Sequence, residues 1–168
     1  IHLHRDSHAA LTRHPRHGIS LAVTDFIARI AGGDMVHVGT ARGKLGDQNK
    51  FTEIPEIIKT IQSPLEHIKP MMGICSGGLT PQNYHYSMDL MGNDIQLQNG
   101  GGIHGHPWGT KGGAIGARQA VEAYMKSIPV EEYAKTHEEL AGAIQAWGNK
   151  YAVASEESAV PELGEGGN

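Results

Sequence analysis

The stretch MVHVGTARGK, residues 35–44, shows the unit from which the chain is built. It begins as a short apolar run that is typical of a buried strand, and it continues into a polar loop rich in glycine. Beyond this loop, apolar residues return at helical spacing in residues 54–61. A strand, a polar loop and a helix in this order predict one repeat of a parallel α/β fold.

The same unit recurs along the chain. We expect strands at residues 1–4, 35–38, 71–75 and 95–98, and helices at 19–30, 54–61, 81–91, 114–125, 129–135 and 136–147. The last helix is predicted to begin with a capping box, in which Thr136 is followed three residues later by Glu139. Four such units equal half of a (β/α)8 TIM barrel, although a doubly wound sheet has the same rhythm. Because the chemically active side chains gather in the loops after the strands, we favour the half-barrel.

Composition excludes several classes of protein. The chain has 168 residues and a formal net charge of -4, which argues against nucleic acid as a partner bound by bulk charge. No apolar run approaches the roughly 20 residues of a membrane span, so we expect no membrane partner. The single cysteine, Cys75, cannot form an intramolecular disulfide, which fits a cytoplasmic protein. We expect a truncated start at Ile1, a folded unit at residues 1–150 and a disordered tail at 151–168.

Two histidines at the start of the chain are candidate functional residues. His2 and His4 are two residues apart on an expected strand, so their side chains share one face. They could line the mouth of a barrel, belong to a histidine-rich surface loop, or bind zinc. No carboxylate cluster nearby completes a metal site, and we therefore predict no metal ligand in this chain.

The loops after the later strands favour phosphate binding. Lys44 is close to glycines in a loop, so it can swing onto a substrate and stabilise a developing anion. The glycines at 77–78 and 100–102 allow backbone N–H groups to approach a phosphate. Cys75 is expected to be a buried strand residue, because nothing near it in the sequence would favour its thiolate.

These motifs resemble the large subunit of ribulose bisphosphate carboxylase (RuBisCO), and the order and intervals agree across nearly the whole chain. The segments that carry the resemblance are 1–5 with 8–10 and 17–20, 34–40 with 43–45, 76–78, and 98–102 with 105–107. They are similar to strands five to eight of that family's barrel, in its C-terminal half. Residues 129–147 resemble the archaeal-type (form III) branch, which favours a role in AMP or nucleotide salvage.

The resemblance implies a role for each matching residue. His4 and Lys44 would be catalytic: His4 as a general acid or base, and Lys44 as the group that closes over the substrate and stabilises the new carboxylate. The substrate-binding residues would be Arg5 and His37 at one phosphate, Ser76, Gly77 and Gly78 at the sugar bisphosphate, and Gln98, Asn99, Gly100 and Gly101 at the other phosphate.

The resemblance also implies the reaction and the partners. A carbon-carbon lyase of this kind adds carbon dioxide to ribulose bisphosphate and yields two 3-phosphoglycerates, with oxygen as a competing substrate in an oxygenase side reaction. It would need Mg²⁺ held by a carbamylated lysine and acidic residues on an earlier strand, which this sequence lacks. The full subunit would form a homodimer or a higher homo-oligomer. The alternatives are a RuBisCO-like enolase or isomerase of sulfur salvage, against which Lys44 argues, and an inactive fragment.

Overall fold

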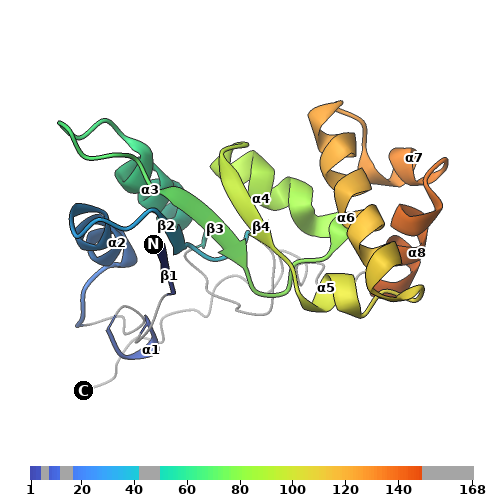
Figure 1. The fold of residues 1–168 in the computed structure, drawn as a ribbon, viewed down its shortest axis with the longest axis horizontal. Coiled ribbons are helices and arrows are strands. Elements are labelled where there is room, and N and C mark those ends of the chain that lie inside the picture. Colours follow the sequence, from blue (N-terminus) through green and yellow to red (C-terminus); the bar gives the residue numbers. More distant parts are fainter. Residues whose placement is uncertain (5–7, 12–16, 42–49, 149–168) are drawn as a thin grey trace, which may run out of the picture.

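Four short parallel strands form the centre of the molecule. The computed structural model describes residues 1–4, 8–11, 17–41 and 50–148. The strands are β1 (His2–Leu3), β2 (Met35–His37), β3 (Met72–Ser76) and β4 (Ile95–Gln98). They pair in chain order, β1-β2-β3-β4, and every pair is parallel. The predicted α/β class is therefore confirmed, and Figure 1 shows the strands side by side in the middle of the molecule.

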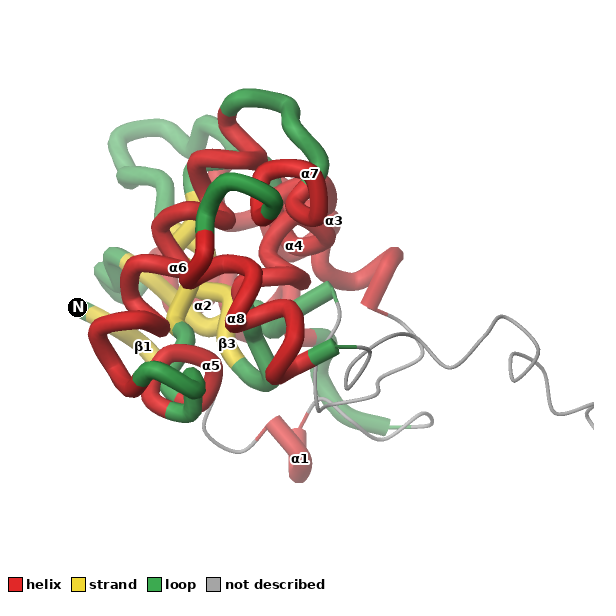
Figure 2. The backbone as a smooth tube through the Cα atoms, turned by 90° about the vertical axis from the view of Figure 1, so that its right-hand side faces the viewer, coloured by secondary structure: helices red, strands yellow, loops and turns green. Residues whose placement is uncertain are grey.

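Helices follow each strand. They are α1 (His8–Leu11), α2 (Leu21–Ile30), α3 (Lys50–Gln62), the 3-10 turn η1 (Pro81–Asn83), α4 (Tyr84–Met91), α5 (Gly101–His104), α6 (Gly109–Met125), α7 (Val130–Ala134) and α8 (Glu138–Trp147). Helices α3 and α4 contact each other and lie on the same side of the sheet (Figure 1). Helices α6 and α8 pack side by side, and they face the viewer in Figure 2.

The hydrophobic core lies between the sheet and α3 and α4, and it continues into α2 and into α6, α7 and α8. Ile57 and Ile61 of α3 are fully buried there. Gly73 of β3 lies directly beneath α3, because a Cβ atom at this position would come within 2.6 Å of Ile58 Cδ1. This close approach fixes the distance between the helix and the strand, and it explains why a glycine interrupts an otherwise apolar strand.

Buried Arg29 attaches α2 to the last turn of α3 and to the loop that precedes β3. Its guanidinium donates hydrogen bonds to the backbone carbonyls of Thr60, Ile68 and Lys69 at 2.9–3.2 Å. Only 1% of this residue is exposed, so its charge is compensated by fixed carbonyl dipoles rather than by water. The first two strand-helix units are thereby held in one orientation.

The strand register divides the side chains of the sheet between two faces. His2 pairs with Met35, His37 pairs with Ile74, and Ser76 pairs with Gln98. Because side chains alternate along a strand, residues 2, 37, 76 and 98 all point to the same face. The opposite face carries Leu3, Val36, Cys75 and Leu97, which belong to the core or pack against it. One face of the sheet is therefore apolar and covered by helices, and the other carries polar side chains at the strand ends.

The structure differs from the sequence prediction at several helix ends. Residues 8–11 form α1 where we expected only a polar loop, and residues 101–104 form α5 where we expected a glycine loop. Helix α6 begins at Gly109, five residues before the predicted start. The expected capping box is wrong, because the N-cap of α8 is His137 rather than Thr136. The Thr136 hydroxyl contacts the His137 ring and the Tyr133 carbonyl instead.

Two expectations about the whole chain remain predictions. The predicted disordered tail at 151–168 lies outside the described residues. The predicted boundaries of the folded unit, residues 1–150, likewise remain a prediction. Among the helices in the described part of the chain, none is long and apolar enough to cross a membrane.

Candidate functional site

The candidate site lies where the parallel strands end. His37, Ser76 and Gln98 are the last residues of β2, β3 and β4, and His4 follows β1 directly. Parallel strands bring their carboxyl ends to the same edge of a sheet, and these four residues also share one face. The structure thus brings together predicted site residues that are up to 94 positions apart in the sequence.

His37 is the centre of this cluster. Its Nδ1 lies 2.6 Å from the Ser76 hydroxyl, and its Nε2 lies 2.7 Å from Nε2 of His2. The His4 ring meets the His37 ring edge-on, with centroids 4.9 Å apart. His37 is only 6% exposed, whereas His2 and His4 are exposed. The buried imidazole therefore connects a hydroxyl on one side to an exposed imidazole on the other.

Two glycines turn the chain sharply after β3. Gly77 and Gly78 have φ angles of 103° and 75°, in the left-handed region that side chains with a Cβ rarely adopt. The carbonyl of Gly77 accepts a hydrogen bond from the Thr40 hydroxyl at 3.1 Å, and the carbonyl of Gly78 accepts one from the Asn83 amide at 3.1 Å. These two hydrogen bonds fix the backbone of the turn, and they therefore also fix the position of Ser76, which directly precedes it.

Asn99 organises the loop after β4. Its Nδ2 donates to the Tyr84 hydroxyl at 2.6 Å, and its Oδ1 accepts from the backbone N–H of Gly102 at 2.9 Å. Gly100 and Gly101 are exposed, and a Cβ atom at either position would meet nothing within 4 Å. Asn99 is therefore a structural anchor of the turn, and the open space that a ligand could fill lies over the two glycines.

Two predicted residues cannot be placed. Arg5 and Lys44 lie outside the described residues, so their predicted roles remain predictions. Sequence reasoning also missed contributors that the structure reveals. Thr40 fixes the Gly77 carbonyl, and Tyr84 holds Asn99. His2 was already a candidate from the sequence, but its contact with His37 was not predicted. The sequence pointed to His2 because it lies two residues from His4 on a predicted strand, so the two side chains share a face. It contained no comparable indication for Thr40 or Tyr84.

Burial changes the proton affinity of two groups behind the site. Burial raises the pKa of the Cys75 thiol from 9.0 to about 12, although a hydrogen bond with Ser87 lowers it slightly. Burial also raises the pKa of the Tyr84 hydroxyl to about 12, against a smaller lowering by Asn99. Both groups are therefore neutral near pH 7. Cys75 is confirmed as a buried strand residue.

The residues of this cluster do not form a magnesium site. Within the described part of the chain, no group of three or more His, Cys, Asp or Glu side chains is placed to hold a metal ion. Mg²⁺ prefers oxygen ligands, whereas the groups that meet here are imidazoles and a hydroxyl. The described residues thus do not fit this ion.

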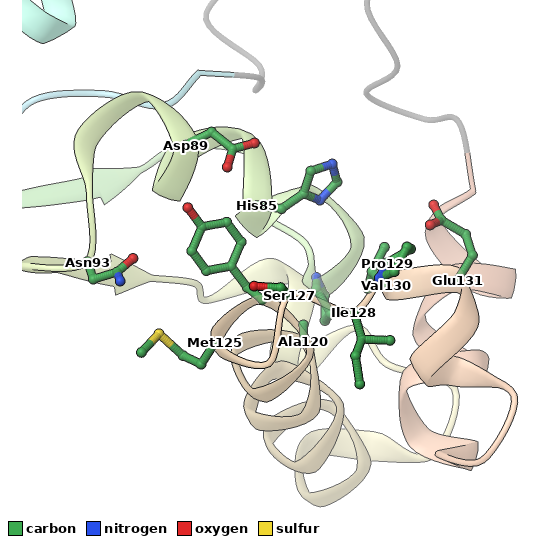
Figure 3. Close-up of a pocket in the computed structure, with 12 residues that line it drawn as sticks. His85, Asp89, Asn93, Ala120, Met125, Ser127, Ile128, Pro129, Val130 and Glu131 are labelled. Atoms are coloured by element: carbon green, nitrogen blue, oxygen red, sulfur yellow. The ribbon is translucent and has the colours of Figure 1, made fainter.

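A cavity of about 610 Å³ lies elsewhere, between α4, the end of α6 and the start of α7 (Figure 3). Its lining includes His85, Asp89, Tyr124 and Glu131. None of its lining residues belongs to a strand or to the predicted site. The cluster at the strand ends has the convergent polar groups, so we take that cluster as the candidate site.

Comparison with known proteins shows the family of the chain. Residues 1–147 match the family described as ribulose bisphosphate carboxylase large chain, catalytic domain. The ribulose bisphosphate carboxylase of Archaeoglobus fulgidus is 43% identical over 162 residues, which cover 88% of this chain and 37% of that protein.

Solved structures give the same result. The octameric ribulose-1,5-bisphosphate carboxylase/oxygenase of Pyrococcus horikoshii has a TM-score of 0.83 and 39% identity, over 90% of this chain and 36% of that one. The dimeric archaeal Rubisco of Hyperthermus butylicus has a TM-score of 0.78 and 40% identity, over 88% of this chain and 37% of that one. The chain thus spans little more than a third of the length of these relatives.

Proposed function

Because the chain belongs to the family of ribulose bisphosphate carboxylase large chains, we propose that it forms part of an enzyme that carboxylates ribulose bisphosphate. The product would be cleaved into two 3-phosphoglycerates. The observation that supports this proposal best is the convergence of His4, His37, Ser76 and Gln98 on one face at the carboxyl ends of four parallel strands. Enzymes built on parallel barrels place their chemistry at this end of the strands.

The fold that we propose for the whole catalytic unit is a (β/α)8 TIM barrel, of which these strands are numbers five to eight. The sequential strand order supports a barrel, because a doubly wound sheet reverses its order at a switch point. The polar face of the sheet would line the barrel interior at its mouth. In a closed barrel, the edges of β1 and β4 would pair with the strands of the other half.

The proposed roles follow from chemistry and position. Ser76, Gly77 and Gly78 would contact the sugar bisphosphate, whose oxygens accept hydrogen bonds from a hydroxyl and from backbone N–H groups. Gln98, Asn99, Gly100 and Gly101 would form the site for one phosphate, in the open space over the two glycines. His37 and Arg5 would bind the other phosphate.

The catalytic roles belong to His4 and Lys44. His4 is exposed at the strand ends, so its imidazole can give a proton to the substrate or take one from it during hydration and cleavage. Lys44 would stabilise the carboxylate that forms when carbon dioxide adds, because an ammonium group is a compact positive charge.

The ion and the partners are also proposals. Mg²⁺, which stabilises an enediolate when it is bound, would be held by a carbamylated lysine and acidic residues outside this chain. Oxygen would compete with carbon dioxide. A homodimer or a higher homo-oligomer is in line with the dimeric and octameric relatives. Similarity to archaeal proteins favours a place in AMP or nucleotide salvage in the cytoplasm.

The test is fixation of labelled bicarbonate by the full-length protein that carries this sequence. We expect acid-stable label in phosphoglycerate, dependent on both Mg²⁺ and ribulose bisphosphate. Lys44→Ala should lower the rate by about a hundredfold or more, the usual effect of removing a group that stabilises developing charge. Lys59→Ala, at an exposed lysine of α3, is the control and should have no effect.

Two results would contradict the proposal. A full-length protein that is folded but gives no acid-stable label would exclude the carboxylase reaction. Turnover by the 168-residue chain alone would show that the metal is bound by residues within it.

A further inference from the structure

We propose that His2 is a positioning residue: it donates a hydrogen bond to His37 and thereby fixes which way the Ser76 hydroxyl points. The direction of the hydrogen bond and its kinetic consequence rest on the proposed function, whereas the contacts do not. The geometry itself depends on three side chains from three neighbouring strands. His2 belongs to β1, His37 ends β2 and Ser76 ends β3.

The distances leave little freedom for the protons. Nε2 of His2 and Nε2 of His37 are 2.7 Å apart, which requires one hydrogen between them, on one ring or the other. The other nitrogen of His37, Nδ1, lies 2.6 Å from the Ser76 hydroxyl. A neutral imidazole has one donor and one acceptor nitrogen. The role of His37 toward His2 therefore determines its role toward Ser76.

Two arrangements satisfy these contacts when both rings are neutral. If His2 donates, His37 carries its proton on Nδ1 and donates it to the Ser76 oxygen, so the Ser76 proton is directed elsewhere. If His37 donates to His2, its Nδ1 accepts the Ser76 proton, and the hydroxyl is no longer a donor. These arrangements differ in whether Ser76 can donate to a ligand at the strand ends.

If the substrate carries phosphates, the first arrangement is the more useful one, in which His2 donates to His37. The phosphate oxygens of such a substrate accept hydrogen bonds and do not donate them when ionised, so a Ser76 hydroxyl that is free to donate can bind them. The register of β1 and β2 keeps His2 next to His37, since His2 pairs with Met35 and shares its face with His37. The exposed side of His2 lets its ring take either tautomer without breaking a buried contact.

Two variants, His2→Gln and His2→Leu, distinguish hydrogen-bond donation by His2 from a simple packing role. His2→Gln keeps an N–H donor of similar reach, whereas His2→Leu keeps bulk but has no donor. His2 is exposed, so neither change should unfold the protein. His67→Leu serves as a matched control, because His67 is also exposed and lies outside the cluster.

The first measurement is the tautomer of His37, from nitrogen NMR of the full-length protein labelled in its histidine rings. We expect a single Nδ1–H tautomer in the wild type, in His2→Gln and in His67→Leu, and a mixture of tautomers in His2→Leu. An Nε2–H tautomer in the wild type, or an unchanged tautomer in His2→Leu, would overturn the proposal. This readout does not need activity, so it can fail or succeed independently of the carboxylase assignment.

The second measurement is kinetic and uses ribulose bisphosphate. His2→Leu should lower kcat/KM by about tenfold, the effect expected from one disordered hydrogen-bond donor. His2→Gln should restore most of this loss. Equal losses in both variants would show that the ring of His2 matters for another reason, and the positioning role would be wrong.

Discussion

Cys75 and Tyr84 show how strongly single residues behind the site are shielded from water. Cys75 is fully buried in β3, where its sulfur lies 3.5 Å from the sulfur of Met91. Tyr84 is 3% exposed at the start of α4, and its hydroxyl is held by Asn99. Burial disfavours the charged forms of both side chains, which raises both pKa values to about 12. Both groups therefore stay neutral near pH 7, and the neutral Tyr84 hydroxyl keeps its hydrogen bond with Asn99.

A first prediction concerns the reactivity of Cys75. A rise in the pKa of the thiol from 9.0 to about 12 lowers the thiolate fraction at pH 8 by about a thousandfold. We expect alkylation by iodoacetamide to be slower than that of a cysteine peptide by at least this factor. The rate can be followed by mass spectrometry. Rapid alkylation of the folded protein at pH 8 would show that the thiol is exposed.

The same shift gives the pH dependence of stability its sign. The folded state keeps the Cys75 proton up to about pH 12, whereas the unfolded thiol loses it near 9.0. The unfolded state thus binds fewer protons between these values, so the contribution to stability, complete below pH 9, falls as the pH rises. Cys75→Ala should make the unfolding free energy, measured in urea, less dependent on pH above 9.

Residue identity alone explains only part of the site. The sequence indicated that His4, His37, Ser76 and Gln98 would gather at the strand ends, because each follows or ends an apolar run. It did not predict the contact between His2 and His37. That contact depends on the register of β1 against β2, and a shift by one residue would turn His2 to the opposite face. The register depends on how the strands pack against the rest of the fold, so it cannot be predicted from the sequence of either strand alone.

At the scale of elements, α5 combines glycines of two different kinds. Gly102 is buried, and a Cβ atom there would come within 2.6 Å of both the Asn99 side chain and the Leu79 carbonyl. Gly101 is exposed and has open space where a Cβ would be. The first glycine is needed by the fold. Gly101 leaves open space above the backbone, which the phosphate group of the proposed substrate would occupy.

Gly101→Ala and Gly102→Ala form a matched pair that tests this distinction. Gly102→Ala should destabilise the protein by about 1–3 kcal/mol, because the new methyl group collides with backbone and displaces Asn99. Gly101→Ala should leave stability unchanged or slightly higher, since alanine favours a helix. It should nevertheless weaken the binding of inorganic phosphate. Urea unfolding and calorimetric titration measure the two effects, and equal stability losses in both variants would contradict our interpretation.

The same glycines explain which elements were predicted poorly. Every strand end was predicted to within one residue, because short apolar runs between polar loops are a strong local signal. The start of α6 was missed because glycine has a low helix propensity. Tertiary packing requires a glycine there, since a Cβ atom on Gly113 would collide with the backbone of Ile103 in α5. Contacts between helices therefore override local preference at this point.

At the scale of the whole molecule, α2 has two unlike sides. Its buried side carries Leu21, Ala22, Asp25 and Arg29, and it packs toward α3. Its other side is apolar but exposed: Val23 is 48%, Ile27 56% and Ile30 53% accessible. Ile1, next to β1, is 70% exposed. We call Val23, Ile27 and Ile30 the α2 stripe. Exposed apolar surfaces of this kind usually pack against another part of the protein or another chain. They lie at the β1 end of the sheet (Figure 1), where the proposed barrel would continue.

This stripe yields a prediction about the proposed half-barrel. In the 168-residue chain, Val23→Gln with Ile27→Gln should change the unfolding free energy by no more than about 0.5 kcal/mol, because both side chains are already exposed. Self-association, measured by analytical ultracentrifugation, should decrease. In the full-length protein, the same pair should cost about 2–4 kcal/mol, since each side chain would lose the free energy of its remaining burial.

The control for this comparison is Met125→Gln at the end of α6. Met125 is also apolar and 59% exposed, but it belongs to α6, which lies away from β1 on the other side of β4 (Figure 1). We expect it to have a small effect in both the short chain and the full-length protein. A full-length protein that tolerates polar residues at 23 and 27 as well as it tolerates one at 125 would contradict the half-barrel, because the α2 stripe would then face solvent in the complete enzyme.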